Sequence, residues 1–157
     1  NALTTSEKRY REAQEVANLA SNIVVKLPTT LAGVQTCVRC TENDIKTNLT
    51  LCFSPSQALI VAKAGATYVS PFVGRLDDIS QFGMDLIRQV VQIYKNYDFK
   101  TEVLVASIRH PLHLVESALI GAGVATIPFD VIGKLLQHPL TDSGLEKFLK
   151  DWDKVPK

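Results

Sequence analysis

The chain has 157 residues, of which 46% are hydrophobic and 21% charged, and its formal net charge is +1. Because basic and acidic residues are mixed along the chain, no charged surface for nucleic acid or anionic lipid is indicated, and we expect neither partner. No apolar run approaches the roughly 20 residues needed to span a bilayer, and the first residues lack signal-peptide features. We therefore expect one soluble, cytoplasmic domain over residues 1–157, without a membrane partner.

Strand-like and helix-like segments alternate along the chain. The first helix is expected from a capping box between Thr4 and Glu7. A later one has Ser54 as its cap, Pro55 in its first turn and Gly65 as its end. The predicted strands are 23–30, 45–54, 66–72, 102–107 and 124–127, and the predicted helices are 4–20, 30–41, 54–65, 79–97, 109–123, 129–137 and 141–152. Continuously apolar strands joined by helices predict a parallel sheet, either covered on both faces or closed into a barrel.

Polar residues gather where the predicted strands end. In parallel α/β proteins the carboxyl ends of the strands form a common mouth, so these residues are candidates for a site. They comprise one amine, an amide, small hydroxyls, a phenyl ring and two guanidiniums: Lys26, Asn48, Thr50, Ser70, Phe72, Arg75, Ser107 and Arg109. Such a set suits a carbonyl compound that carries phosphate, since a lysine can form an imine and arginines can clamp a phosphate.

Lys26 interrupts the apolar run "IVVKLPTT", residues 23–30. Two interpretations are open from the residues alone. The side chain can reach solvent at the strand end, or it is held in a dry place, where burial disfavours the charged form and leaves neutral amine for nucleophilic attack.

Five motifs together resemble the transaldolase family, in its small single-domain branch related to fructose-6-phosphate aldolase. They are "VVKLPTT", "TNLTLCFSPSQA", "YVSPFVGRLDD", "VASIRHP" and "HPLTDSGLEKFLKDW". The resemblance covers nearly the whole chain and implies a parallel (β/α)8 TIM barrel. Three further strands precede the lysine in that family, so we expect this chain to hold the last five βα units plus a preceding helix. We therefore interpret the sequence as an N-terminally truncated barrel.

The resemblance implies a pentose phosphate pathway enzyme that transfers a dihydroxyacetone unit between sugar phosphates through a Schiff base, without metal or organic cofactor. Lys26 would form the imine, Thr50 would act with the catalytic water, and Asn48 would bind substrate hydroxyls. Ser70 and Phe72 would line the pocket, and the phosphate would be held by Arg75, Ser107 and Arg109. Phenylalanine at position 72 is typical of transaldolases, whereas the aldolase branch has tyrosine.

Two alternatives remain open: an aldolase of the fructose-6-phosphate type, and a non-catalytic fragment that serves only in assembly. The family also implies a ring-shaped pentamer or decamer, with the last helix packing across a subunit boundary. Asp44 occupies a turn where the family usually has glycine, so we expect a cost in stability if its φ is positive.

The cysteines and two of the histidines are expected to lie in the core or at the surface rather than in the site. Cys37, Cys40 and Cys52 are interpreted as reduced, buried small hydrophobes rather than as a disulfide or metal site. His110 and His113 are interpreted as surface residues, at most near the phosphate.

Overall fold

Five parallel strands form one sheet in the computed structural model, which describes residues 6–156. The strands lie side by side in chain order, as β1 (Val25–Pro28), β2 (Thr47–Cys52), β3 (Tyr68–Pro71), β4 (Glu102–Val105) and β5 (Val124–Ala125). Each neighbouring pair is parallel. The predicted α/β class and all five predicted strands are therefore confirmed. Pairing of each strand with the next along the chain is the arrangement found in the wall of a (β/α) barrel.

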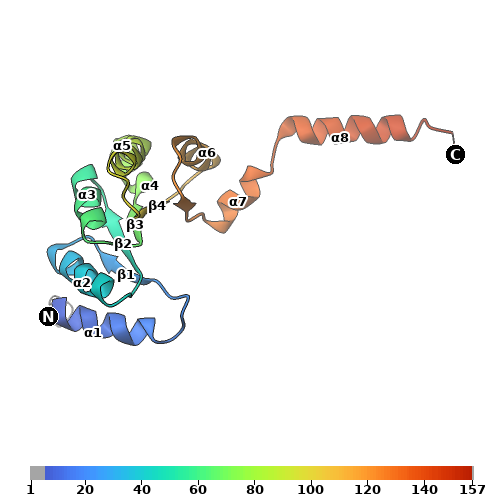
Figure 1. The fold of residues 1–157 in the computed structure, drawn as a ribbon. Helices are drawn as coiled ribbons and strands as arrows, with labels where there is room; N and C mark the ends of the chain where they lie inside the picture. The colour runs from blue at the N-terminus through green and yellow to red at the C-terminus, as the bar shows by residue number, and fades with distance from the viewer. Residues whose placement is uncertain (1–5, 157) are drawn as a thin grey trace.

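Helices cover one side of this curved sheet (Figure 1). They are α1 (Ser6–Ala17), α2 (Leu31–Glu42), α3 (Pro55–Lys63), α5 (Gly83–Asn96) and α6 (Pro111–Ile120). Between them and the sheet lies a core of fully buried residues that includes Leu49, Val61, Val69, Ile87 and Val105. We call the opposite side of the sheet, which these helices do not cover, the inner face.

Two helix starts show why the chain changes direction after β1 and β2. The Thr30 side chain accepts a hydrogen bond from the Gly33 amide at the start of α2. Ser54 accepts one from the Gln57 amide, and Pro55 occupies the first turn of α3, as predicted. Thr4 of the predicted capping box lies outside the described residues.

Three local features differ from the sequence-based prediction or add to it. A short helix, α4 (Val73–Asp77), directly follows β3 and was not predicted, because five residues without a side-chain cap carry little periodic signal. The predicted helix 79–97 begins only at Gly83. Asp44 has a φ of 56°, so the condition under which we expect a cost in stability is met.

The last two helices, α7 (Phe129–Leu135) and α8 (Pro139–Trp152), lead away from the sheet (Figure 1). No residue of α8 is buried, although Leu145, Phe148, Leu149 and Trp152 fall on one side of it. Helix α8 thus presents an apolar side that nothing in residues 6–156 covers.

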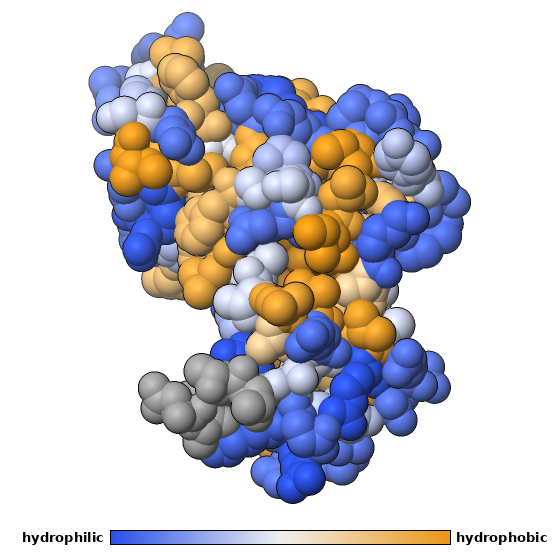
Figure 2. All heavy atoms as spheres, turned by 90° about the vertical axis from the view of Figure 1, so that its left-hand side faces the viewer, coloured by the Kyte–Doolittle hydropathy of each residue, from blue (hydrophilic) through white to orange (hydrophobic). Residues whose placement is uncertain are grey.

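The surface over the N-terminal half mixes charged side chains with apolar patches (Figure 2). Leu31 of α2 and Ile60 of α3 are among the exposed apolar residues of this half. None of the helices within residues 6–156 has the length and apolar character required to cross a lipid bilayer.

Candidate active site

The strand register places four polar side chains in one row across the sheet. From β1 to β4 the successive register partners are Lys26, Asn48, Tyr68 and Glu102. Side chains alternate between the two faces of a strand, and Val25 and Leu27 are buried against the helices. Lys26 and its row therefore lie on the inner face.

Lys26 is exposed rather than enclosed in a dry pocket. Among the described residues β1 is an edge strand, and only its helix-facing residues are well buried. Within residues 6–156 the Lys26 ammonium has no hydrogen bond or ion pair. The exposure of Lys26 within these residues corresponds to a side chain that reaches solvent, and its chemical role stays a prediction.

Thr50 lies on β2, next to the strand that carries Lys26, and is the register partner of Pro28. Its carbonyl oxygen accepts hydrogen bonds from both the amide and the hydroxyl of Thr29, each 2.8 Å long. Its own hydroxyl oxygen is buried and has no hydrogen-bond partner among the described residues. A buried hydroxyl without a partner costs free energy, and such groups often mark sites that bind water or ligand.

The backbone after Thr50 is strained. The register shifts between Leu49 and Cys52, and Leu51 has a φ of 58°. For leucine this left-handed conformation costs about 1 kcal/mol or more. Because of this register shift, Leu51 is exposed to solvent whereas Cys52, the last residue of β2, is buried in the core.

Asn48 and Ser70 are brought together by their neighbouring strands. The Ser70 hydroxyl donates a 2.7 Å hydrogen bond to the Asn48 side-chain carbonyl. Ser70 is buried, so this bond fixes which end of the Asn48 amide faces the serine. The NH2 group of Asn48 is consequently the end available to donate to a substrate hydroxyl.

Phe72 follows β3 and is half-buried. Its ring meets the edge of Phe53, with 5.8 Å between the ring centroids and an interplanar angle of 67°. This T-shaped arrangement is favourable for aromatic pairs. Phe53 was not among the predicted site residues, and its position directly after β2 is the signal that could have found it.

The predicted phosphate ligands lie at the ends of β3 and β4. Arg75 is exposed on α4. Ser107, just after β4, is half-buried and has a φ of 62°, and its carbonyl accepts a 3.0 Å hydrogen bond from the Gly74 amide. The left-handed turn at Ser107 buries Ile108 and brings Arg109 back towards α4.

Arg109 is held in place by α4 and α6. Its guanidinium Nη2 lies 2.9 Å from the Asp78 carboxylate, directly after α4. Its side chain also passes against Gly74, where an added Cβ would lie only 2.5 Å from Arg109 Nε. The single described guanidinium contact leaves other N–H groups of Arg109 able to bind an anion.

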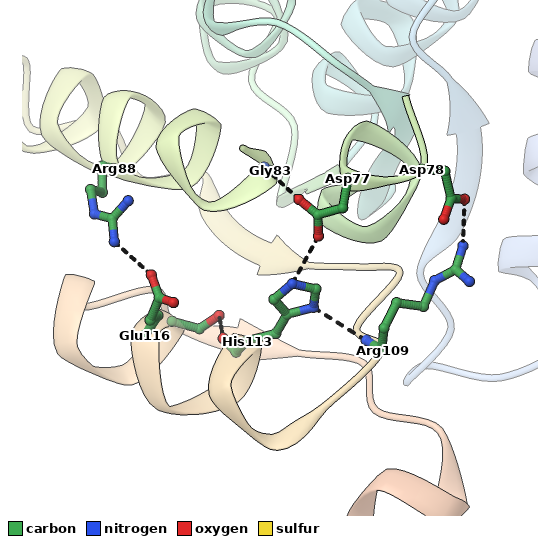
Figure 3. Close-up of polar contacts among 8 residues, drawn as sticks. Asp77, Asp78, Gly83, Arg88, Arg109, His113 and Glu116 are labelled. Atoms are coloured by element: carbon green, nitrogen blue, oxygen red, sulfur yellow. Dashed lines mark hydrogen bonds and ion pairs between the residues drawn. The ribbon is translucent and has the colours of Figure 1, made fainter. Parts of the chain in front are cut away.

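His113 contradicts the surface interpretation, because it is only 3% exposed. Its Nδ1 accepts a 3.2 Å hydrogen bond from the Arg109 amide, and its Nε2 lies 2.9 Å from Asp77 Oδ2 (Figure 3). His110, by contrast, is exposed, as expected. His113 and Ser117, one turn later, are the buried residues of α6, and no sequence signal indicated this.

The cysteines are core residues, as predicted. Cys37, Cys40 and Cys52 are free thiols that are fully buried. Burial raises the pKa of Cys40 and of Cys52 to about 11, so both remain thiols at neutral pH. Within the part of the chain that the structure describes, no group of three or more His, Cys, Asp or Glu residues could hold a metal ion.

The predicted residues thus form two groups. Lys26, Asn48, Thr50 and Ser70 lie on β1 to β3, whereas Ser107 and Arg109 follow β4 and meet α4, which carries Arg75. Phe72 stands between the groups, because it pairs through its backbone with Ala106 just after β4. The amine thus lies on β1 at one edge of the sheet, and the two guanidinium residues follow β3 and β4.

Comparison with known proteins identifies the family of the chain. The chain is 58% identical over 154 residues to a probable transaldolase of Anaeromyxobacter dehalogenans, covering 98% of this chain and 71% of that protein. It is 59% identical over 151 residues to a probable transaldolase of Thermodesulfovibrio yellowstonii, covering 96% and 71%. A probable transaldolase of Aquifex aeolicus is 57% identical over 151 residues, with 96% and 70% covered. Residues 2–157 match the family Transaldolase/Fructose-6-phosphate aldolase, and the chain belongs to that family.

Proposed function

We propose that the protein is a transaldolase that moves a dihydroxyacetone unit from a ketose phosphate to an aldose phosphate, as in the pentose phosphate pathway. Family membership and the names of the relatives support the reaction class. The observation that carries the proposal is that the strand next to Lys26 brings Asn48, its register partner, and the buried, unpartnered hydroxyl of Thr50 to the same part of the sheet. Lys26 is the imine-forming residue and Thr50 places the water that the imine chemistry releases and consumes.

The proposed reaction begins when the unprotonated Lys26 amine adds to the ketone carbon. The carbinolamine then takes up a proton and loses water, which gives an iminium. The bond between the first and second carbons beyond the iminium carbon then breaks, and its electron pair moves towards the iminium to form an enamine. The hydroxyl on the second carbon gives its proton to a base, and that carbon leaves as the aldehyde. The enamine carbon forms a new bond to the acceptor aldehyde, whose oxygen takes the proton back from the base. Water then hydrolyses the iminium and frees the Lys26 amine. The base is expected on the upstream strands that the family resemblance implies, and this chain spans 71% of the Anaeromyxobacter dehalogenans protein.

The other residues bind and orient the sugar phosphate in this proposal. The Asn48 amide, oriented by Ser70, donates to substrate hydroxyls. Arg109 and Arg75 bind the phosphate with Ser107, because guanidiniums match phosphate geometry with several parallel hydrogen bonds.

Phe72 favours transfer over simple cleavage. A phenyl ring cannot donate a proton to the enamine, so the three-carbon unit stays bound until an acceptor aldehyde arrives. We expect Phe72→Tyr to raise release of free dihydroxyacetone without an acceptor. An unmodified chain that already releases it at the rate of the variant would instead favour the fructose-6-phosphate aldolase type.

Trapping tests the imine directly. The chain is incubated with fructose 6-phosphate, reduced with borohydride and digested for mass spectrometry. We expect a reduced sugar adduct on Lys26, with six carbons where the iminium is trapped before cleavage and three carbons where cleavage has occurred. The adduct should be absent from Lys26→Arg and present in Lys63→Arg, which changes an exposed lysine on α3.

An unchanged mass for the wild-type chain, or an adduct on another lysine, would refute the proposed role of Lys26. An unchanged mass would support the non-catalytic fragment.

We also propose that α8 packs across a subunit boundary in a ring-shaped homo-oligomer, as the family resemblance implies. The exposed apolar side of α8, with Phe148 71% and Trp152 71% exposed, supports this assembly. Sedimentation velocity should show an oligomer that dissociates in the double variant Phe148→Ser/Trp152→Ser, but not in Lys147→Ser/Lys150→Ser. A wild-type monomer would contradict the proposal.

A further inference from the structure

Arg109 is fixed at its backbone as well as at its guanidinium. The amide of Arg109 donates to His113 Nδ1, and Nη2 is paired with Asp78. The stem crosses Gly74, at which an added Cβ would lie 2.7 Å from Arg109 Cγ. An arginine held at three points loses less conformational entropy when it binds an anion than a freely moving one.

The contacts of His113 fix its tautomer. Nδ1 accepts a hydrogen bond from the Arg109 amide, so it cannot carry a proton. Nε2 must then carry the ring proton, which it donates to Asp77 Oδ2 at 2.9 Å. The contact with Arg109 requires a neutral imidazole, because a doubly protonated ring has no acceptor.

Asp77 orients the ring. Its Oδ2 accepts from His113, while its Oδ1 accepts a 2.9 Å hydrogen bond from the Gly83 amide at the start of α5. Two accepted hydrogen bonds restrict the rotation of this carboxylate. Asp77 therefore links α4, α5 and α6 through one side chain (Figure 3).

We propose that Asp77 and His113 are positioning residues, and that the neutral Nε2–H form of His113 holds the Arg109 backbone where the arginine can bind the substrate phosphate. This inference rests on the proposed role of Arg109 as a phosphate ligand. His113 touches neither substrate nor reacting atoms in the proposal. It acts only through Arg109.

The electrostatic surroundings favour the neutral ring. Burial lowers the pKa of His113, and His110, whose ring centroid lies 3.8 Å away, lowers it further. Asp77 on α4 and Glu116 on α6 act in the opposite direction, but Glu116 is also paired with Arg88 of α5. Because the pKa lies below its usual value, His113 stays neutral at neutral pH and gains a second proton only in acid. Anion binding should then weaken.

Sulfate is the probe, since it mimics phosphate and keeps its charge across the relevant pH range. We expect sulfate to shift the Arg109 amide resonance of the full 157-residue chain, and nitrogen NMR of labelled histidine to show the Nε2–H tautomer for His113 at neutral pH. A protonated Nδ1 at neutral pH, or an Arg109 amide that sulfate does not affect, would overturn the inference.

Two variants separate positioning from mere folding. Asn at position 113 keeps an acceptor near the Nδ1 position, whereas Gln keeps a donor near Nε2 and leaves the Arg109 amide unpartnered. We expect His113→Asn to bind sulfate within about threefold of wild type, and His113→Gln to bind it roughly tenfold more weakly. The affinity of wild type should fall in acid more steeply than that of His113→Asn, which has no ring to protonate.

Equal losses in both variants, no loss in either, or loss in His113→Asn alone would overturn the inference. Should a variant fail to fold, the wild-type tautomer and the acid dependence of its sulfate affinity still decide. The trapping experiment on Lys26 is independent of these readouts. A missing Lys26 adduct together with the expected sulfate results would refute the proposed reaction and leave the positioning role of His113 intact.

Discussion

The two ends of the candidate site are built in opposite ways. At the Arg109 end, an ion pair, a backbone hydrogen bond to a buried histidine and a close contact with Gly74 fix one side chain. At the Lys26 end, the amine is solvated and the Thr50 hydroxyl has no partner within residues 6–156.

This difference matches what each end does in the proposed reaction. A phosphate keeps its charge throughout, so a prearranged cation binds it best. The reacting ketone changes its bonding at each step, and the groups that serve it must be able to exchange partners. Satisfied contacts thus stabilise the binding end, while unsatisfied ones mark the reactive end.

The largest effect on stability is expected at Gly74. An added Cβ would lie 2.3 Å from the Ser107 carbonyl and 2.5 Å from Arg109 Nε. Gly74→Ala should lower the free energy of unfolding by about 1–3 kcal/mol, measured in urea, and weaken sulfate binding. Gly133→Ala is the matched control in helix α7, where the Cβ meets nothing within 4 Å. A Gly74→Ala variant as stable as this control would show that the Arg109 end is loosely packed.

A smaller effect of opposite sign is expected at Thr50. Thr50→Val replaces an unpartnered hydroxyl by a methyl group of similar shape, so the free energy of unfolding should rise by up to about 1 kcal/mol. Formation of the Lys26 adduct should slow in the same variant. Thr50→Ser, which keeps the hydroxyl, is the control. A destabilised Thr50→Val would mean that the hydroxyl is satisfied, and the contrast between the two ends would fail.

Acid should weaken the Arg109 end selectively. The pKa of His113 is lowered in the folded chain, first by burial and then by His110. Above about pH 6.5 the ring is neutral in both states, whereas below it the unfolded chain takes up the proton first. The free energy of unfolding should therefore fall as the pH drops from 6.5 through the lower folded pKa. Urea titrations should show a steeper fall for wild type than for His113→Asn, and equal slopes would contradict the prediction.

The smallest effect on stability is expected at Asp44, where the backbone is strained outside the candidate site. Asp44 has a φ of 56°, close to the 62° of Ser107, but lies in an exposed turn. Asp44→Gly should raise the free energy of unfolding by a few tenths of a kcal/mol and at most about 1, since aspartate tolerates this conformation better than most residues. Thermal unfolding measures it. A destabilised glycine variant would show that the aspartate side chain makes a contact worth more than the strain.

Periodicity predicted most of the fold because apolar strands and capped helices carry local signals. Ser54 caps the start of α3, and Gly65, with a positive φ, follows its end, as expected. Helix α4 and the burial of His113 could not be predicted in this way, since both depend on contacts between segments distant in sequence. On α6 the apolar residues Leu112, Val115 and Leu119 are exposed, whereas His113 and Ser117 are buried. Tertiary hydrogen bonds override the simple rule that apolar residues turn inward.

The candidate site residues could be predicted because they lie at the ends of the predicted strands. In the structure the pairing of β2 with β3 brings two of them, Asn48 and Ser70, into contact. The environment of Lys26 was beyond sequence reasoning, because it depends on whether anything covers the inner face next to β1. The same apolar sequence pattern is found in central strands and in edge strands.

Strand β1 has a sheet neighbour on one side only among the described residues, so its other flank offers backbone donors and acceptors that can pair with a further strand. At high protein concentration this flank is a place where two chains can associate edge to edge. Lys26 puts a positive charge in the middle of that strand, and like charges on two such edges repel one another. Because salt screens this repulsion, association should be weakest in dilute solution at low salt, and Lys26→Arg, which keeps the charge, should associate less than an uncharged substitute.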